Sequence, residues 1–376
     1  MTNFRRFLYI QAVFLLFTGS ILFAVPAWKF MIVGDSRSSS ATVNNGVNVP
    51  ILSEIADEAV RQDVDFILFP GDLVNGGVSQ TVLQSQLATW MSTMRPVYDA
   101  GIKVYAVRGN HDVGSPAGTT AWKNVFSGVA ALPQNGPAGE LSLTYSVAHK
   151  NVFVLALDQY VSSMRVNQPW VDAQLAANTL PHVVAFGHVP AFKVDHSDCL
   201  DDYATQRNTF WQSLKNAGCK IYACGHDHFY DHSVIDDLDG DPDNNIHQYL
   251  VGTAGAPLRS WSPPYNGNNS GMTVEQWHYS EQYGYVLVDV QDDENMRPVW
   301  YGRDPVSGDY MPALGSADLD GNHFVDINDL AILSMYWLSD GCRLTNDFCN
   351  GADIDQLTTV DIDDFKYFSE KWLENL

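Results

Sequence analysis

Five short apolar runs, each ending at a glycine followed by a polar residue, constrain the fold of this chain more than any other feature. Such runs, rich in Val, Ile, Phe and Tyr, are typical of buried β-strands. The five runs are KFMIVGD (29–35), DFILFPGD (65–72), KVYAVRGNHD (103–112), HVVAFGHVP (182–190) and KIYACGHDH (220–228). Helices are predicted between the first three runs, at 49–62 and 80–100, and before the last run, at 209–218.

Three later apolar segments, at 247–256, 283–291 and 297–304, are predicted strands without helices between them. Together with the earlier runs they predict an α/β domain that contains either one mixed sheet or two packed sheets. A chain of 376 residues, 45% of them hydrophobic, is long enough to bury a core of that size.

Polar side chains stand at the carboxyl end of each of the five runs. They are Asp35, Asp72, Asn110, His188, His226 and His228, with His111 and Asp112 beside Asn110. Because ligand sites in α/β sheets gather at the carboxyl ends of strands, we expect these side chains to share one rim. Carboxylate, amide and imidazole donors suit Fe, Mn, Zn or Co, and this set exceeds the needs of one ion. Each motif alone also fits an ordinary turn or helix cap, but five in order predict a two-metal centre with one shared carboxylate.

These motifs resemble those of the calcineurin-like metallophosphoesterases, which include the purple acid phosphatases. The family pattern is an Asp motif, Gly-Asp, Gly-Asn-His-Asp or Glu, a single His, and Gly-His-x-His, and the match spans about residues 29–304. The resemblance implies a four-layer α/β/β/α sandwich of two mixed sheets. It also implies the metal ligands: Asp72 as the bridge, Asp35 and His228 on one metal, and Asn110, His188 and His226 on the other.

The resemblance implies a phosphoric ester hydrolase, either a phosphatase or a phosphodiesterase, acting on a small phosphate ester or nucleotide. Two cations would share the charge of the ester and turn a bound water into hydroxide, which attacks phosphorus without a covalent enzyme intermediate. His111, held by Asp112, is expected beside the metals, where it stabilises charge or protonates the leaving oxygen.

Two positions depart from the family pattern. The family's first motif often reads Asp-x-His, but here Arg37 stands in place of the His, and guanidinium is no ordinary metal ligand. Purple acid phosphatases supply a Tyr three residues after the bridging Asp, and here that residue is Asn75. We expect Arg37 to grip the substrate phosphate as a catalytic residue while water fills the vacant metal position. The alternative is that Arg37 points away into a surface ion pair.

The N-terminal segment has the layout of a secretory signal peptide: Arg5 and Arg6, an apolar run, and a small-residue site near Ala27. An uncleaved membrane anchor is the alternative, but Thr18-Gly19-Ser20 interrupt the run, so no stable membrane span is expected after cleavage. The mature protein is thus expected to be secreted, periplasmic or at the cell surface, where disulfides persist. Of five cysteines, Cys342 and Cys349 form the predicted pair, and Cys199, Cys219 and Cys224 are not assigned.

A change in charge marks a second domain near the C-terminus. The chain has a net charge of −23, which argues against a nucleic-acid partner. Residues 315–376 contain 13 Asp and Glu against 3 Lys and Arg, a net of −10, and follow a Gly- and Pro-rich stretch. The predicted division is a signal peptide at 1–27, the phosphoesterase domain at 28–306, a linker at 307–315 and a small all-α domain at 316–376.

The tail contains an internal repeat in which Asp318, Asp326 and Asp329 align with Asp353, Asp361 and Asp364. Each copy places oxygen side chains at the spacing of a calcium loop that leads into an apolar helix. The predicted calcium ligands are Asp318, Asp320, Asn322, Asp326, Asp329, Asp353, Asp355, Asp361 and Asp364. Because Leu357 stands where an oxygen ligand belongs, the second loop is expected to bind calcium more weakly, if at all.

The paired loops resemble a type I dockerin, a module that docks into a cohesin on another protein. That resemblance implies a calcium-dependent protein partner. The alternative is a solvated acidic pair of helices that only caps the domain. A second hypothesis for the whole chain follows: a surface protein with weak or no catalysis, whose main role is docking through this tail.

Overall fold

The computed structural model describes residues 27–77, 79–114, 116–262, 265–269, 271–312, 317, 319, 325–342, 347–354 and 359–374. The predicted signal peptide therefore lies outside the described residues, apart from its last position. Within the described ranges, no helix combines the length and the apolar character that crossing a membrane requires.

Six strands form the first sheet, in the order β13-β12-β11-β1-β2-β3. They are β1 (Trp28–Ile32), β2 (Phe66–Phe69), β3 (Lys103–Ala106), β11 (Gly284–Val290), β12 (Met296–Arg303) and β13 (Tyr310–Pro312). Strands β1, β2 and β3 are parallel, whereas β11 pairs antiparallel with β1 and β12, so the sheet is mixed. Strand β13 pairs with β12 and lies within the predicted linker, so the sheet extends beyond the predicted domain end at 306.

Seven strands form the second sheet, in the order β10-β8-β9-β7-β6-β5-β4. They are β4 (Tyr145–His149), β5 (Val152–Ala156), β6 (His182–Phe186), β7 (Cys219–Cys224), β8 (Tyr230–Asp236), β9 (Ile246–Val251) and β10 (Thr273–Ser280). The central strands β5, β6, β7 and β9 are parallel, and the outer pairs are antiparallel. Strand β10 was not predicted because none of its residues is fully buried, so it lacks an apolar run.

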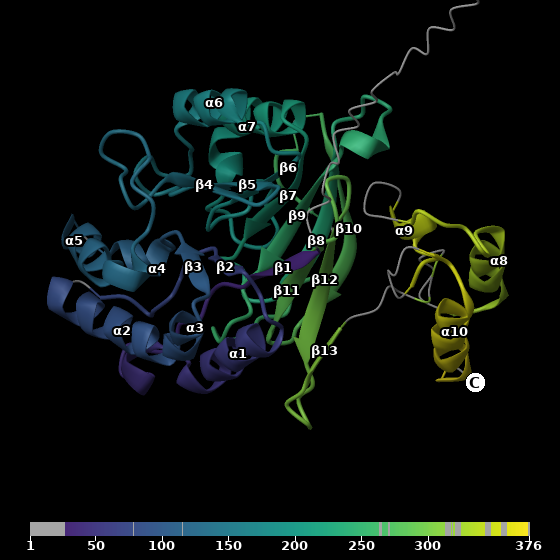
Figure 1. The fold of residues 1–376 in the computed structure, drawn as a ribbon, viewed down its shortest axis with the longest axis horizontal. Helices are drawn as coiled ribbons and strands as arrows, with labels where there is room; N and C mark the ends of the chain where they lie inside the picture. The colour runs from purple at the N-terminus through teal and green to yellow at the C-terminus, as the bar shows by residue number, and fades with distance from the viewer. Residues whose placement is uncertain are drawn as a thin grey trace, which may run out of the picture.

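Helices cover the outer face of each sheet, as Figure 1 shows. Helices α1 (Val49–Arg61), α2 (Gln80–Thr93) and α3 (Arg95–Asp99) lie outside the first sheet, and α6 (Gln168–Ala177) and α7 (Ala204–Asn216) outside the second. The largest buried cluster joins side chains of both sheets, including Phe30, Val154 and Ile221. The adjoining residues Leu155 and Tyr222 point the other way, into a cluster with α7. The predicted sandwich of two mixed sheets is confirmed.

One predicted helix is broken in two. The stretch 80–100 forms α2 and α3, which divide just before Pro96. Proline has no N–H to donate and its ring clashes with the preceding turn, so a continuous helix through this position is disfavoured. Two further helices, α4 (Asn110–Val113) and α5 (Pro116–Val125), follow β3 and were not predicted.

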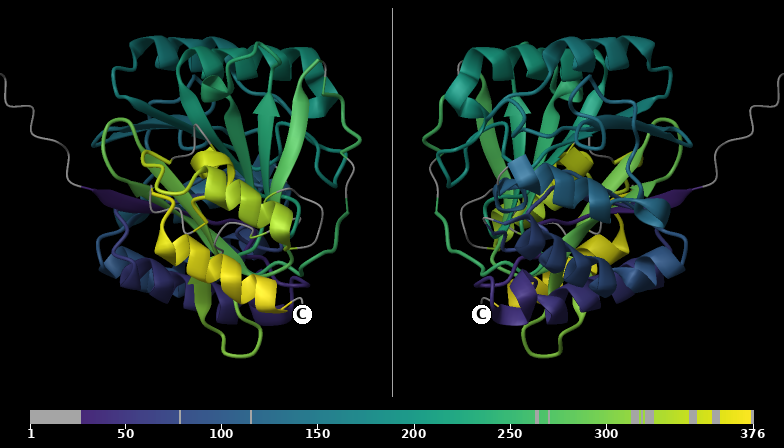
Figure 2. Two further views of the ribbon diagram at one scale, coloured as in Figure 1. Left: turned by 90° about the vertical axis from the view of Figure 1, so that its right-hand side faces the viewer. Right: turned by 90° about the vertical axis from the view of Figure 1, so that its left-hand side faces the viewer.

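The C-terminal residues form a small unit with its own core, set beside the two sheets (Figures 1 and 2). Its helices are α8 (Ile327–Met335), α9 (Asp347–Asn350) and α10 (Ile362–Glu374). The buried residues of this core are Ala317, Leu333, Cys342, Cys349, Ala352, Ile354, Val360 and Phe368. Cys342 and Cys349 form the predicted disulfide, whereas the other three cysteines are buried and free.

Candidate metal centre

The polar strand ends of both sheets meet at one rim. Asp35, Asp72 and Asn110 follow strands of the first sheet, whereas His188 and His226 follow neighbouring strands of the second. Asp35, Asp72 and His226 have φ angles of 60°, 50° and 76°, in the left-handed region that residues with a Cβ seldom adopt. Strained backbone of this kind is concentrated at functional sites, where the surrounding structure holds it.

Two glycines allow the strand ends to approach this closely. A Cβ added at Gly109 would collide with the carboxylate and the backbone nitrogen of Asp72. A Cβ added at Gly225 would collide with the carboxylate of Asp35. The glycine before each polar residue is therefore a packing requirement of the site as well as a turn signal.

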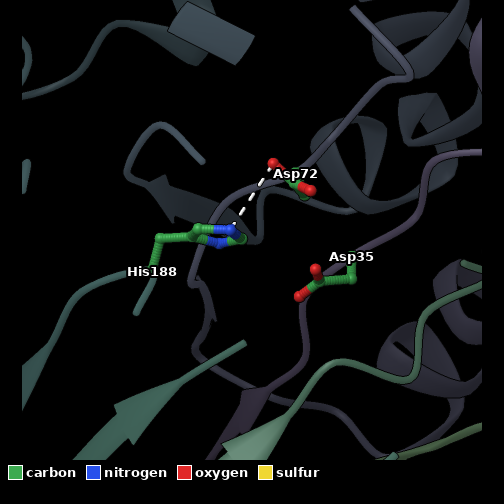
Figure 3. A group of neighbouring side chains, drawn as sticks. All are labelled: Asp35, Asp72 and His188. Atoms are coloured by element: carbon green, nitrogen blue, oxygen red, sulfur yellow. Dashed lines mark ion pairs between the residues drawn. The ribbon is translucent and has the colours of Figure 1, made fainter. Parts of the chain in front are cut away.

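Acceptor atoms converge on one point of this rim. Figure 3 shows Asp35, Asp72 and His188, whose ligand atoms lie within 4.8 Å of one another. His188 donates its Nδ1 hydrogen to the carbonyl of Pro70, at 2.7 Å, so its Nε2 carries a lone pair. That Nε2 lies 3.0 Å from Asn110 Oδ1 and 3.5 Å from Asp72 Oδ1. Lone pairs facing one another in this way fit a cation, which would bind all of them.

His226 completes this group. Its Nδ1 lies 3.2 Å from His188 Nε2 and 3.3 Å from Asn110 Oδ1. Its Nε2 lies 3.1 Å from Asp198 Oδ1, a contact that orients the ring. Asp72, Asn110, His188 and His226 thus offer two oxygens and two nitrogens to one ion, and we name them the four-ligand group.

Burial and neighbouring charges together shift the pKa values of the buried side chains at this rim. Burial lowers the pKa of His188 to about 4, so its imidazole is neutral, as a metal ligand must be. Burial, together with the nearby charge of Asp72, raises the pKa of Asp35 well above its usual range. Burial acts in the same direction on Asp72, but His188 and His111 hold its pKa below the ordinary value. Crowded buried carboxylates of this kind call for a positive charge between them.

A second group lies on the other side of Asp72. His228 donates its Nδ1 hydrogen to the carbonyl of Pro257, at 3.1 Å, and its Nε2 lies 3.7 Å from Asp35 Oδ1. Arg37 enters this group: its Nη2 lies 3.4 Å from His228 Nε2 and its Nε 3.7 Å from Asp72 Oδ2. The alternative that Arg37 points away into a surface ion pair is therefore wrong.

The predicted pairing of His111 with Asp112 is also wrong. The Asp112 carboxylate is fully buried and accepts hydrogen bonds from the backbone N–H groups of Gly109, Leu73 and Val74. His111 instead donates its Nδ1 hydrogen to the carbonyl of Asn75, at 2.7 Å. The physical reason is that adjacent residues at the start of α4 point in different directions. Asp112 ties the loops after β2 and β3 together, and Asn75 orients His111.

A pocket of about 220 Å³ is lined by Arg37, Asp72, Asn110, His111, His226 and His228. Its walls also include four residues that were not predicted from the sequence: His196, Pro257, Leu258 and Arg259. His196 pairs with the buried Asp227, and Arg259 contacts His196. Asp195, His196 and Asp227 form a further group of closely spaced potential ligands. His196 and Asp198 lie in the segment VDHSDC (194–199), soon after the strand-end His188. The closely spaced Asp and His residues of this segment were the sequence signal for them. The segment is a loop without apolar periodicity, so the pattern analysis did not single it out.

Comparison with known proteins identifies the family. A sequence model of calcineurin-like phosphoesterases matches residues 29–230, which is more than half of the chain. The chain belongs to the calcineurin-like phosphoesterase family. The fold of this family implies a dinuclear centre of transition metals, and Asp35, Asp72 and His188 lie close enough together to hold a metal ion.

Solved structures of low sequence identity share this calcineurin-like fold. Purple acid phosphatase PPD1 from yellow lupin superposes with a TM-score of 0.55 and 16% identity over 76% of this chain and 53% of that one. PhoD superposes with a TM-score of 0.57 and 12% identity, over 77% of this chain and 69% of that one. GAP50, the anchor in the inner membrane complex of Plasmodium, superposes with a TM-score of 0.51 and 16% identity, over 76% of this chain and 87% of that one. The chain spans about half the length of the lupin phosphatase. No curated protein sequence matches it significantly.

The predicted calcium ligands fall partly outside the described residues, which exclude Asp318, Asp320, Asn322 and Asp355. The two repeats share the same hydrogen bonds at the start of their helices. At the start of α8, the backbone N–H of Asp326 donates a hydrogen bond to the carboxylate of Asp329. At the start of α10, the backbone N–H of Asp361 donates to the carboxylate of Asp364 in the same way. Asp329, Asp353 and Asp364 are buried carboxylates of this small unit.

Proposed function

We propose that the protein is a secreted, metal-dependent phosphoester hydrolase whose reaction takes place in the pocket at the rim of the two sheets. The observation that carries this proposal is the convergence of the four-ligand group, in which lone pairs of two imidazoles, an amide and a carboxylate face one point. Family membership supports the reaction class. The apolar N-terminal segment supports secretion.

Two sets of residues would hold the cations. Asp72, Asn110, His188 and His226 would hold one cation, and the family's second position faces Asp35, Asp72 and His228. When bound, such cations neutralise the charge of the phosphate and activate water as the nucleophile.

His111 is placed to act on the leaving group. Its Nδ1 is occupied by the carbonyl of Asn75, so its Nε2 faces the pocket, 3.9 Å from Asp72 Oδ2. In its protonated form the ring also carries a hydrogen on Nε2, and from this position it can donate that proton to the leaving oxygen of the ester. Asn75 therefore acts on catalysis through its backbone, by fixing the ring orientation.

Arg37 is placed to bind the phosphate itself. Its Nε is buried and has no hydrogen-bond partner among the described residues, although it points toward the pocket. A phosphate oxygen would satisfy that N–H, and the planar guanidinium can hold two oxygens at once. Arg259 also lines the pocket and adds a second positive charge to it.

Turnover of p-nitrophenyl phosphate and of bis(p-nitrophenyl) phosphate, with Mn, Fe, Zn or Co added, tests the proposal. We expect hydrolysis of at least one ester, and a loss of at least about 100-fold in kcat/KM for His188→Ala, since metal ligands are essential. His182→Ala is the matched control, because that histidine begins the same strand and donates to the carbonyl of Asp292, away from the pocket. No turnover by metal-loaded protein would favour the docking protein without efficient catalysis.

We further propose that residues 316–376 are a calcium-binding docking module for a cohesin-like partner, joined to the enzyme by residues near 312–315. The repeated capping at Asp326 and Asp361 supports the two-fold arrangement of this unit. An apolar groove of about 340 Å³ supports docking; its lining is Leu330, Leu333, Ser334, Trp337, Ile362 and Phe365. Exposed apolar surface of this kind marks interaction sites.

Isothermal titration of the full chain with purified cohesin domains tests the module. We expect binding in calcium that is lost on chelation, and at least about 10-fold weaker binding for Trp337→Asp, since a charge would enter the groove. Val306→Asp is the control, because Val306 is 95% exposed and lies outside the groove. Equal binding with and without calcium would contradict the calcium assignment, and no binding to any cohesin would contradict the docking role.

A further inference from the structure

We propose that the pocket binds one transition metal per chain, and that the guanidinium of Arg37 occupies the place of the second. The retained cation is the one held by the four-ligand group, Asp72, Asn110, His188 and His226. The inference rests on the proposed function, in that it concerns the same metal-dependent site, but it departs from the two-metal centre that the family fold implies.

The first step of the argument is the lone pair of His228. Its Nδ1 hydrogen is committed to the carbonyl of Pro257, so Nε2 has a single lone pair available. Arg37 Nη2 lies 3.4 Å from that atom and donates to it. A metal bound to His228 would need the same lone pair, at about 2.0–2.1 Å. The hydrogen bond and the metal therefore compete for one atom.

The second step is charge. A guanidinium stays protonated in proteins, so Arg37 brings a full positive charge to within 3.7 Å of Asp72 Oδ2. The side chain is 17% exposed, so little water screens that charge. A second cation between Asp35, Asp72 and His228 would lie beside it and would be repelled.

The third step is the number of ligands. The four-ligand group offers a carboxylate, an amide and two imidazoles, enough for a four-coordinate ion. Among the residues that the structure describes, the other position is faced by Asp35, His228 and the shared Asp72, because Arg37 stands where the family often has a His. The weaker site is thus also the one that carries the competing charge.

The test is metal content and binding stoichiometry of the full chain, measured without substrate. The protein is stripped with a chelator and titrated with Co²⁺ or Zn²⁺ in millimolar calcium, so that calcium fills the sites proposed for the tail. Calorimetry and elemental analysis then count the metal per chain, and electron paramagnetic resonance of the cobalt form distinguishes an isolated ion from a coupled pair. We expect one equivalent and an isolated ion for the wild type.

Variants of Arg37 decide the cause. Arg37→His restores the ligand of the family motif, so it is expected to bind two equivalents and give a coupled cobalt pair. Arg37→Ala removes the charge without adding a ligand, and is expected to bind the second equivalent at least about 10-fold more tightly than the wild type does. Arg95→His is the matched control, because Arg95 is 75% exposed and pairs with Asp99 on the surface; it should keep one equivalent.

Two results would overturn the inference: two tight equivalents in the wild type, or one equivalent in both folded Arg37 variants. Its failure is distinguishable from failure of the proposed function. One equivalent of metal per chain in a protein without turnover would support the role of Arg37 and contradict the proposed hydrolysis. Two equivalents of metal per chain in an active enzyme would support hydrolysis and contradict the role of Arg37.

Discussion

A buried ion pair directly behind the metal centre offers a sharp test of how the two sheets are held together. Arg108 follows β3 of the first sheet and precedes Gly109 and Asn110, whereas Asp158 follows β5 of the second sheet. Arg108 Nε lies 2.6 Å from Asp158 Oδ2, and the two side chains are 4% and 0% exposed. The pair therefore joins the sheets next to a metal ligand.

Asp158→Asn is the perturbation that isolates the pair. The other carboxylate oxygen, Oδ1, accepts the N–H groups of Tyr160 and Val161, at 2.9 and 3.1 Å, and an Asn oxygen can keep both bonds. The new NH₂ group would then face Arg108 Nε, so the buried guanidinium would lose its carboxylate partner and, among the described residues, keep only the bond from Nη1 to Thr119 Oγ1. Breaking a buried pair in this way costs about 3–5 kcal/mol. Since domains are typically stable by about 5–15 kcal/mol, the loss is large.

Chemical denaturation of the wild type, both single variants and Arg108→Met/Asp158→Asn measures the coupling between the two residues. The double variant removes the buried charge, so it should be more stable than Asp158→Asn alone, because well-packed apolar replacements of buried pairs are often tolerated. Thermal unfolding of Asp158→Asn should shift down by roughly 6–20 °C. A loss below about 1 kcal/mol in Asp158→Asn, or a double variant less stable than Asp158→Asn, would refute the reasoning.

Three further predictions follow from single features. Burial raises the pKa of Asp231 to about 6 from the ordinary 3.8. As pH rises, the unfolded chain therefore releases this proton before the folded protein does. The free energy of unfolding should fall by about 3 kcal/mol between about pH 4 and about pH 6. Asp231→Asn should flatten that part of a Tm-against-pH series, and an unchanged slope would contradict the assignment. Gly109→Ala should weaken transition-metal binding at least about 10-fold by calorimetry, because its Cβ displaces Asp72; unchanged affinity would argue against the close packing. Calcium chelation should lower the unfolding temperature of the C-terminal unit in calorimetry and leave that of the larger domain unchanged. If calcium had exceeded its Kd 100-fold, the free energy of unfolding of the unit falls by about 2.7 kcal/mol. A shift of both transitions, or of neither, would contradict separate calcium binding.

Much of the candidate site was predictable because its residues are local in sequence to strand ends. A buried strand that stops at glycine places the next polar side chain at the rim, and this holds for Asp72 after β2 and for His188 after β6. The two packed sheets, one of the two arrangements left open by the apolar runs, bring those rims together. The disulfide between Cys342 and Cys349 was predictable for the same reason, since the two residues bracket a short loop.

Other parts of the site depend on contacts that no local pattern encodes. The Arg37 side chain points toward His228, with which it forms a hydrogen bond. Arg37 follows a strand of the first sheet and His228 a strand of the second, so this contact depends on how the two sheets pack. The partner of Asp112 is backbone from the loop after β2, although the neighbouring His111 was the closer residue in sequence. His196 and Arg259 reach the pocket from irregular loops, for which apolar periodicity gives no signal.

The sequence by itself determined which chemical groups this protein brings to the rim: acidic, amide and imidazole side chains behind glycines at the ends of apolar strands. The physical reason is that burial and chain direction are local properties of a strand. Only the tertiary structure decided how the hydrogen atoms and charges are shared, with Pro70 and Pro257 orienting two imidazoles and Arg37 lying between His228 and Asp72. Those contacts join segments far apart in the chain, so they exist only once the two sheets have packed.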